Sequence, residues 1–472
     1  MIRVFCAVLA LVLCVAGMGR GGEAFKPTRV DGSPLYPVHY YAPPEGKPPE
    51  IMAQGGFVIL ISDSQGWDDA ATALAQHLAM EGNTVVGLEL PVYRAALARE
   101  DHECTLVTRD LETTARDIEQ TLPYTQYKPP LIVGIGAGAG IAFAAAAQVM
   151  PNTFAGAIGL RFDPGFDAGH KMCLPTVSPE GAPLRYGPVG NHDTIWFQAT
   201  TAAFFFTPSD AFAGPGGGLK DFVAGMPTAR LLAAKGDDIA TVDEAMNQLA
   251  KMGKAEAAVD GLPIVEVPPA AGKEGQHPLV IFYSGDGGWR DLDRKIGGYL
   301  SDQGYFVVGI DSLRYFWRKK DPDRMAADLD RLIRHYGKQA LGDGVILVGY
   351  SFGADIIPFM VNRLSADTKS QLRMVSLLGI SEHASFEIRL QDIVGGTNTD
   401  GPPTLPELIR LKGIPIQCVY GEAEKDSVCD DKALDGSINR VEMAGGHHFD
   451  GDYRHTADLI IAADKTRVSK LK

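Results

Sequence analysis

The chain has 472 residues, 45% of them hydrophobic and 22% charged, which excludes a disordered or collagen-like protein. This length is enough for two or three domains, each with a substantial core. The net charge of -14 argues against nucleic-acid binding through a broad basic face, so no nucleic-acid partner is expected.

The N-terminus has the pattern of an export signal. Arg3 precedes an apolar run, Val4–Met18, which is too short for a typical membrane span. A small-x-small cleavage site follows at Gly22–Ala24. We therefore predict a signal peptide over residues 1–24 and a mature protein in the periplasm. Cys14 leaves a lipid anchor as a less favoured alternative.

The cysteines of the mature chain are even in number, which in an exported protein indicates disulfides. They are Cys104, Cys173, Cys418 and Cys429. Cys418 with Cys429 is the favoured pair because both flank one predicted loop, and the alternative is a set of buried thiols.

The sequence has two similar halves on either side of a Pro/Gly-rich segment, residues 261–278. "FVILISDSQGWDD" from Phe57 resembles "LVIFYSGDGGWRD" from Leu279, and a second match follows at the same offset of 222 residues. A tandem duplication explains such a shared offset. We predict one domain over residues 25–260 and another over 261–472.

Short, continuous apolar runs alternate with helical patterns in each half, as in a parallel sheet with helices on both faces. The strands predicted in the second half are Leu279–Tyr283, Tyr305–Ile310, Gly344–Gly349, Met374–Leu378 and Ile414–Tyr420. The helices predicted there are Asp293–Gln303, Asp323–Tyr336, Phe352–Leu364 and Thr456–Ala463.

A G-x-S-x-G motif centred on Ser351 lies between a predicted buried strand and a helix. This is the setting of a nucleophile elbow, in which glycines relieve crowding around a strained serine. The N–H of Phe352, at the helix N-terminus, would then help to bind an oxyanion. We predict tandem α/β-hydrolase-like domains with Ser351 as the nucleophile. The alternative is a glycine-rich turn with a solvent-facing serine.

The base and acid of such a triad should follow the serine in the order acid, then histidine. His447 and His448 come after a predicted strand, and His447 is the preferred base. Asp426 is the preferred acid because "DSVC" resembles the acid loop of cutinases. Glu424, three residues after Gly421, is the alternative acid.

The loop "YSGDGGW" after the first strand of this half should supply the second oxyanion donor, either Gly285 or Asp286. Asp286, Asp311, Asp355 and Trp289 are candidates for substrate binding, the acids for a cationic group. No metal-ligand spacing or phosphate-binding loop is present, so no cofactor is expected.

The stretch "DSLRYFWRKK" over residues 311–320 combines cations with aromatic residues. Such a composition suits contact with an anionic membrane surface. A solvated helix lead-in beside core aromatic residues is an equally good interpretation.

The signal peptide, the tandem layout and the motifs "FYSGDGGWRD", "GYSFGADIIPF", "CVYGEAEKDSVC" and "GGHHFDGDY" together resemble the bacterial VirJ / AcvB virulence protein family. The second half is similar to the VirJ domain, and the extra N-terminal copy is similar to the AcvB layout. The resemblance implies a periplasmic α/β hydrolase linked to type IV secretion. It also implies hydrolysis of the ester that joins lysine to phosphatidylglycerol, with aminoacylated anionic phospholipid and secretion components as partners.

Two other functions remain open from the sequence. One is an esterase or thioesterase acting on a different, soluble substrate. The other is a non-catalytic periplasmic adaptor for secretion, in which Ser351 is incidental.

The first half lacks the residues of a triad. Gly136 stands at the position of Ser351, and no histidine occurs between His192 and His277, where its base would lie. We therefore predict a degenerate copy that keeps the fold. It would cap the active site, dock on the membrane or a partner, or stabilise the chain.

Overall fold

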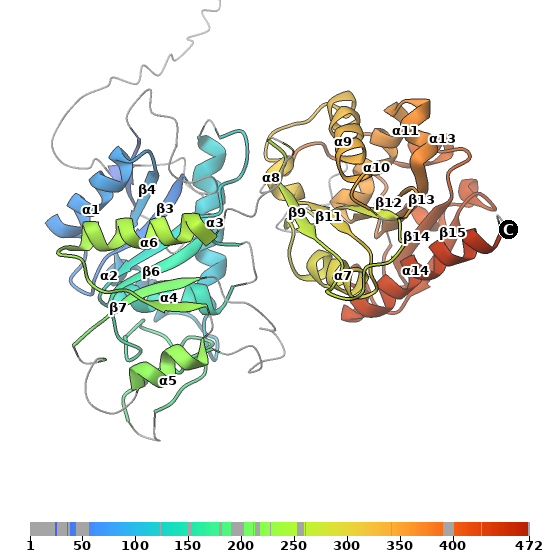
Figure 1. Ribbon diagram of the computed structural model, residues 1–472. Coiled ribbons are helices and arrows are strands. Elements are labelled where there is room, and N and C mark those ends of the chain that lie inside the picture. The colour runs from blue at the N-terminus through green and yellow to red at the C-terminus, as the bar shows by residue number, and fades with distance from the viewer. Residues whose placement is uncertain are drawn as a thin grey trace, which may run out of the picture.

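A computed structural model shows two α/β domains (Figure 1). The structure describes residues 24–25, 35, 38–43, 56–122, 124–149, 153–178, 182–189, 203–210, 212, 218–226, 228–252, 259, 261–340, 342–389, 401–425 and 427–470. The predicted signal peptide, apart from Ala24, lies outside these residues.

The first domain is an eight-stranded sheet with helices on both faces. Its strands are β1 (Ala24–Phe25), β2 (Val38–Tyr41), β3 (Phe57–Ile61), β4 (Thr84–Leu88), β5 (Leu131–Ile135), β6 (Gly156–Phe162), β7 (Phe204–Pro208) and β8 (Ala229–Leu231). Its helices are α1 (Asp69–Met80), α2 (Leu90–Leu97), α3 (Val107–Thr121), α4 (Ala137–Ala147), α5 (Gly218–Gly225) and α6 (Asp238–Met252).

The second domain is a seven-stranded sheet built in the same way. Its strands are β9 (Ile264–Val267), β10 (Leu279–Tyr283), β11 (Val307–Ile310), β12 (Val345–Tyr350), β13 (Leu372–Leu378), β14 (Ile416–Gly421) and β15 (Asn439–Met443). Its helices are α7 (Asp291–Asp302), α8 (Ser312–Tyr315), α9 (Pro322–Tyr336), α10 (Phe352–Arg363), α11 (Ala366–Gln371), α13 (Leu405–Arg410) and α14 (Tyr453–Lys470), with 3-10 turns η1 (Val428–Asp430), η2 (Lys432–Leu434) and η3 (Phe449–Gly451).

The two sheets share one strand order. The first runs β1-β2-β4-β3-β5-β6-β7-β8 and the second, from its other edge, β9-β11-β10-β12-β13-β14-β15. An antiparallel strand pairs at the same place in both, β2 with β4 and β9 with β11, and the strands that follow are parallel. This is the α/β-hydrolase arrangement, so the predicted fold class is confirmed.

Helices cover both faces of each sheet because its strands are apolar on both sides. In the first domain α1 and α6 pack on one face, and α3, α4 and α5 pack on the other. In the second domain α7 and α14 pack on one face, and α9, α10 and α13 on the other. The buried strands β10 and β12 therefore lie at the centre of the second domain and carry the predicted nucleophile at their carboxyl edge.

The duplication extends to individual side-chain contacts. A Cβ on Gly87 would lie 2.2 Å from the Trp67 ring, and a Cβ on Gly309 would lie 2.4 Å from the Trp289 ring. Each tryptophan thus packs flat on a glycine of the neighbouring strand. Trp289 is 1% exposed and lies in the core. The sequence predicted that Trp289 would bind substrate, but the structure does not place its side chain at the surface of the site.

The segment read as a Pro/Gly-rich boundary contains a strand. β9 occupies four residues of it and pairs antiparallel with β11 at the edge of the second sheet. An edge strand tolerates neighbouring prolines, since one of its sides needs no hydrogen-bond partner in the sheet. The predicted β10 agrees with the structure, whereas α14 begins earlier and ends later than predicted.

Two disulfides join the four cysteines that lie beyond the predicted signal peptide. Cys418 pairs with Cys429, as predicted, and Cys104 pairs with Cys173. Such bonds are typical of proteins in oxidising compartments. Over the residues that the structure describes, we find no helix with the length and apolar character to cross a membrane.

Candidate active site

Ser351 lies in a strained turn between β12 and α10. Its φ of 50° and ψ of -120° are unfavourable for a residue with a side chain. The two flanking glycines permit the turn: a Cβ on Gly349 would lie 2.5 Å from the Gly353 oxygen, and one on Gly353 would lie 2.2 Å from the Tyr283 oxygen. The motif glycines thus let α10 begin directly against β10, which is the geometry of a nucleophile elbow.

His447 has an acidic partner. Its Nδ1 lies 2.5 Å from Oε1 of Glu424, and Oε2 of that carboxylate accepts a hydrogen bond of 2.6 Å from the N–H of Gly421. The Glu424 side chain is 6% exposed. Glu424, the second choice from the sequence, therefore contacts the histidine. Asp426, the first choice, lies outside the residues that the structure describes.

The His447 ring lies next to the elbow. The N–H of Ser351 donates to the carbonyl oxygen of Leu378, the residue before Gly379. A Cβ on Gly379 would lie 2.9 Å from Cε1 of His447, so the ring packs directly on this glycine. The Tyr350 ring also lies 5.3 Å from the His447 ring, centroid to centroid. Neighbours of the serine on both β12 and β13 thus contact the histidine.

His448 has different surroundings from His447. The Tyr350 hydroxyl lies 3.2 Å from Nδ1 of His448 and 3.2 Å from the carbonyl oxygen of His447. Burial, together with the neighbouring His447, lowers the pKa of His448. His448 is thus a partly buried ring that contacts the Tyr350 hydroxyl, whereas His447 contacts the Glu424 carboxylate.

A buried carboxylate lies beneath the loop that follows β10. Asp293 is 4% exposed and lies near the backbone N–H groups of Gly285 and Arg290. Burial raises the pKa of Asp293 well above its ordinary value, and these N–H groups oppose the shift. Of the two residues predicted to donate to an oxyanion, Gly285 is buried and Asp286 is half-buried.

In the first domain, the corresponding loop binds a carboxylate of the protein itself. Asp63 stands at the position of Gly285, and its Oδ1 accepts hydrogen bonds of 2.6 Å from the N–H of Ser64 and 3.0 Å from that of Ala137. In the shared register Ser64 corresponds to Asp286 and Ala137 to Phe352. A carboxylate oxygen of the protein thus binds where these two N–H groups of the second domain would bind an oxyanion.

The first domain lacks room for a histidine as well as the histidine itself. Arg161, with φ of 56°, stands at the position of Gly379 and forms an ion pair of 2.7 Å with Asp238. A Cβ on Gly136 would also lie 2.2 Å from the Asp63 carboxylate, so this carboxylate fills the place of a serine side chain. The first domain therefore lacks the triad residues, and its own side chains also fill the space that a serine and a histidine would need.

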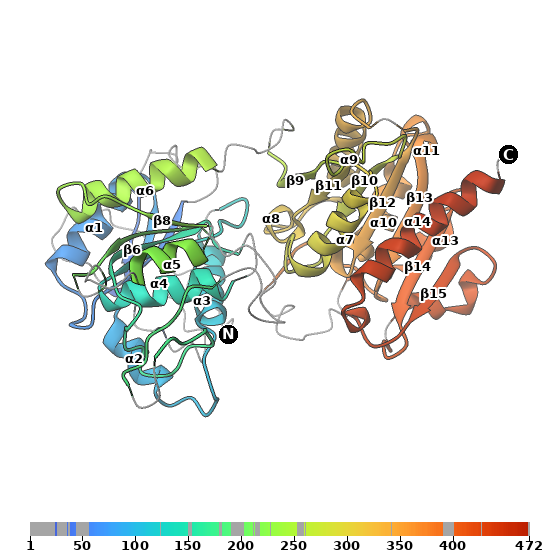
Figure 2. The ribbon, with the colours of Figure 1, turned by 60° about the horizontal axis from the view of Figure 1, so that its bottom comes forward.

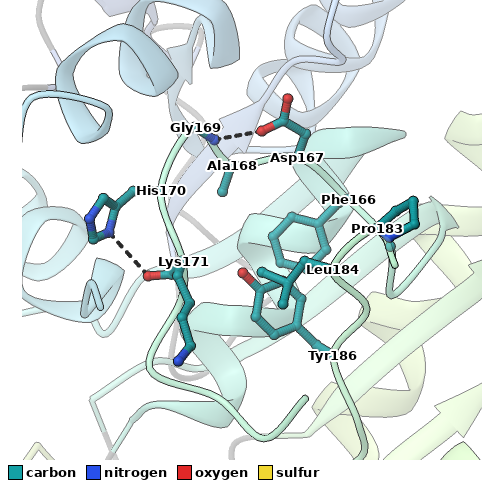
Figure 3. Close-up of a pocket in the computed structure, with 10 residues that line it drawn as sticks. Phe166, Asp167, Ala168, Gly169, His170, Lys171, Pro183, Leu184 and Tyr186 are labelled. Carbon is teal, nitrogen blue, oxygen red and sulfur yellow. Dashed lines mark hydrogen bonds between the residues drawn. The ribbon is translucent and has the colours of Figure 1, made fainter. Parts of the chain in front are cut away.

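A cavity of about 380 Å³ opens instead among the loops of the first domain (Figure 3). Phe166 and Tyr186 form its apolar side, with ring centroids 4.9 Å apart, and Lys171 and Asp167 lie at its rim. The Phe166 ring packs directly against Gly140 of α4. The loop after β6 thus covers α4, the helix that follows Gly136.

The other acids predicted to bind substrate are engaged in the protein's own backbone. Asp311 is 6% exposed and caps α8 by accepting from the N–H of Arg314. Asp355 is 7% exposed and accepts a 2.7 Å hydrogen bond from the N–H of Ser381. Asp286 is only half-buried, so it is the acid of this set that has access to a ligand.

The basic and aromatic stretch over residues 311–320 is packed inward. Tyr315, Phe316 and Trp317 are at most 3% exposed, and Arg318 donates to backbone carbonyl groups of the first domain. The aromatic residues of this stretch thus belong to the core, in line with the second of the two interpretations made from the sequence.

Within the described part of the chain, His, Cys, Asp and Glu side chains form no group of three that would hold a metal ion.

The family model described as bacterial virulence protein (VirJ) matches residues 277–468, which hold the elbow, the histidines and Glu424. The second domain is similar to the VirJ family, and we call it the VirJ domain. The resemblance read from the motifs is therefore confirmed for this domain. No curated protein matches the chain in sequence.

Solved structures similar to the chain each correspond to one domain's length. MenH from S. aureus is 14% identical, with a TM-score of 0.33, over 43% of this chain and 98% of its own. Est1E from Butyrivibrio proteoclasticus is 11% identical, with a TM-score of 0.32, over 44% and 96%. A thioesterase domain from the curacin biosynthetic pathway is 18% identical, with a TM-score of 0.30, over 42% and 94%.

Proposed function

We propose that the VirJ domain is a serine esterase in which Ser351 is the nucleophile, His447 the base and Glu424 the acid. The observation that carries this proposal is the His447–Glu424 pair at 2.5 Å, packed against the strand end that holds the strained Ser351. A serine needs such a base, and the base needs an acid to orient it.

The first step is attack of the Ser351 hydroxyl oxygen on the ester carbonyl carbon. Because Glu424 binds Nδ1 of His447, Nε2 is the nitrogen that takes the serine proton. The carbonyl oxygen becomes an oxyanion, which we assign to the N–H groups of Phe352 and Asp286. Asp63 supports this assignment, because its carboxylate occupies the corresponding hole in the first domain.

Collapse of this intermediate breaks the ester bond. The alcohol oxygen of the leaving group takes the proton from His447, and the acyl group stays on Ser351. His447 then removes a proton from water, whose oxygen attacks the acyl carbon. The Ser351 oxygen leaves with that proton, so the products are one alcohol, one carboxylic acid and the restored enzyme.

The substrate that we propose is the lysyl ester of phosphatidylglycerol in the periplasm. The VirJ family supports a bacterial envelope setting, and the disulfides fit an oxidising compartment. The half-buried Asp286 carboxylate beside the elbow suits the ammonium groups of a lysyl ester. The products would be free lysine and phosphatidylglycerol.

Two measurements test the reaction and the substrate separately. A fluorophosphonate probe should label the wild-type chain and should not label Ser351→Ala. Equal labelling of both would leave the adaptor as the function of the chain. Incubation of the purified chain with vesicles of lysyl-phosphatidylglycerol should release lysine in the wild type alone. Labelling of Ser351 without lysine release would point to a different ester or thioester.

A further inference from the structure

The first domain contacts the loop that follows β10. Glu112 of α3 forms an ion pair of 2.7 Å with Arg290, the last residue of that loop, and also binds Arg116 of its own helix. The Arg290 side chain is 13% exposed and donates a second hydrogen bond, of 3.0 Å, to Thr153. Both groups that hold the Arg290 guanidinium therefore belong to the other domain.

A second contact joins the same helix to the segment that follows β11. The Arg318 guanidinium donates to the carbonyl oxygens of Gln120, Leu122 and Tyr124, around and beyond the C-terminus of α3. These carbonyl groups have no partner inside the helix, and the end of a helix dipole attracts a cation. Arg318 thus caps a helix of the other domain.

Apolar packing and a third loop complete the contact. The Tyr127 ring is 1% exposed and lies 5.1 Å from the Trp317 ring, within the core cluster of the second domain. The Gln120 side chain also donates to the carbonyl oxygen of Ile388, in the loop after β13. In two views α3 and α8 lie on the facing sides of the two domains (Figure 2). We call residues 112–127 with these partners the α3 contact.

The loops that meet the α3 contact all follow parallel strands of the VirJ domain. They come after β10, β11 and β13, two of which flank β12 and its serine. The carboxyl ends of parallel strands form the active-site edge of an α/β sheet. The first domain therefore rests on the edge that holds Ser351.

We propose that the first domain is a positioning domain for the second, and that Glu112 sets the oxyanion loop, residues 284–290, through Arg290. The buried Asp293 lies beneath this loop inside the VirJ domain, and Glu112 holds the last side chain of the loop from the other domain. Preorganised N–H donors lose much of their effect when they are displaced by a fraction of an ångström. The role of Glu112 in catalysis rests on the proposed function, whereas its effect on the loop does not.

The experiment compares full-length variants. Glu112→Gln removes the charge at nearly constant shape, and Gln126→Ala is the matched control, because Gln126 donates across the domain boundary to Gly261 and not to the loop. Hydrogen–deuterium exchange of residues 284–290, the melting temperature, and kcat and KM for p-nitrophenyl acetate are measured for each.

Glu112→Gln should speed exchange in the loop and lower kcat about tenfold to a hundredfold, with KM nearly unchanged. The double variant Glu112→Gln with Arg290→Gln removes the ion pair and leaves Arg116, so its melting temperature should recover in part while kcat stays low. Recovery of kcat together with the melting temperature would reduce Glu112 to a structural role. Should Glu112→Gln fold poorly, Thr153→Val keeps the ion pair and should still speed exchange.

Unchanged loop exchange in Glu112→Gln, or the same change in Gln126→Ala, would overturn the proposal. Failure of the proposed function has a different signature, because the wild-type chain would then show no Ser351-dependent hydrolysis while the loop still responded to Glu112→Gln.

Discussion

The two domains hold the same turn and differ in what surrounds it. Ser351 has φ 50° and ψ -120°, and Gly136 has φ 57° and ψ -119°. Around the serine are a histidine and an acid, together with the N–H groups of Phe352 and Asp286 that we propose for an oxyanion. Around the glycine are Asp63 and Arg161, which occupy the corresponding positions with the protein's own side chains.

This difference shows that the elbow is a property of the fold and not of catalysis. The close approach of α4 to β3 needs Gly134 and Gly138, whose Cβ atoms would lie within 2.4 Å of backbone atoms, whether or not a serine is present. The proposed catalysis would depend on the space left open around the turn. The predictions below probe that space, from the largest expected effect to the smallest.

The two histidines should differ most. His447→Ala should lower kcat about 10³-fold or more, because it removes the group that contacts Glu424. His448→Ala should change kcat by less than about tenfold, since His448 contacts Tyr350. Steady-state kinetics with one activated ester measures both. Equal, mild losses would show that the base is misassigned.

Glu424→Gln should lower kcat about 10²- to 10⁴-fold with little change in KM, because an amide no longer stabilises the protonated His447 ring. The same ester assay checks this value. Asp426→Asn is the control and should stay close to the wild type. A large loss in Asp426→Asn alone would move the role of acid to that residue.

Gly379→Ala tests the room needed by the base. The new Cβ would lie 2.9 Å from Cε1 and 3.0 Å from Nδ1 of His447. Displacement of the ring should lower kcat about tenfold to a hundredfold. Gly413→Ala is the matched control, since Gly413 also has a positive φ, of 81°, but nothing lies within 4 Å of a Cβ there. If both variants lose activity alike, backbone strain and not the ring is responsible.

The substitution Gly136→Ser tests whether the first domain can fold with a serine at the position of its turn. The side chain would collide with Asp63 at a positive φ, so the free energy of unfolding should fall by about 2 to 4 kcal/mol. Adding Asp63→Gly should recover part of this loss, as urea unfolding would measure. Additive losses in the double variant would mean that the two positions are not in contact. Neither variant should gain activity, since no histidine is present.

Asp117 on α3 corresponds to Leu332 on α9, which is a buried apolar residue. The substitution Asp117→Asn tests what a buried carboxylate costs in stability at this position. Burial raises the pKa of Asp117 from 3.8 to about 6. The folded state therefore holds its proton more tightly, and the wild type loses stability as the pH rises from about 4 to about 6. Asp117→Asn should gain about 1 to 3 kcal/mol above pH 6 and nothing below pH 4. Unfolding at pH 4 and pH 8 gives both values, and an equal gain at both would exclude the titration.

The fold and the strained turn at Ser351 could be predicted because both depend on short-range patterns. Buried strands appear as continuous apolar runs, and the elbow needs glycines next to Ser351 in the chain. The duplication added the comparison with Gly136. The strand β9 could not be predicted from the sequence, because a strand of four residues beside prolines has no clear pattern of its own.

The rest depends on how segments distant in sequence meet. Glu424 and Asp426 are two residues apart, and only the fold of their loop decides which carboxylate reaches His447. Gly379 looks like any glycine until the histidine packs on it. Glu112 and Arg290 belong to different domains, so neither residue carries a sign of the other in its local sequence.

The Cys418–Cys429 bond has a consequence for when the protein becomes active. Glu424 lies between these cysteines, on a segment held at β14 by one and at η1 by the other. A reduced chain would hold the far end of this segment by hydrogen bonds alone, such as the one from the N–H of Val428 to Ile380, so we expect the acid to be held less firmly at His447 before oxidation. A newly made chain would then be a poor hydrolase for lipids of the compartment where it is synthesised, and its maturation would be coupled to its delivery.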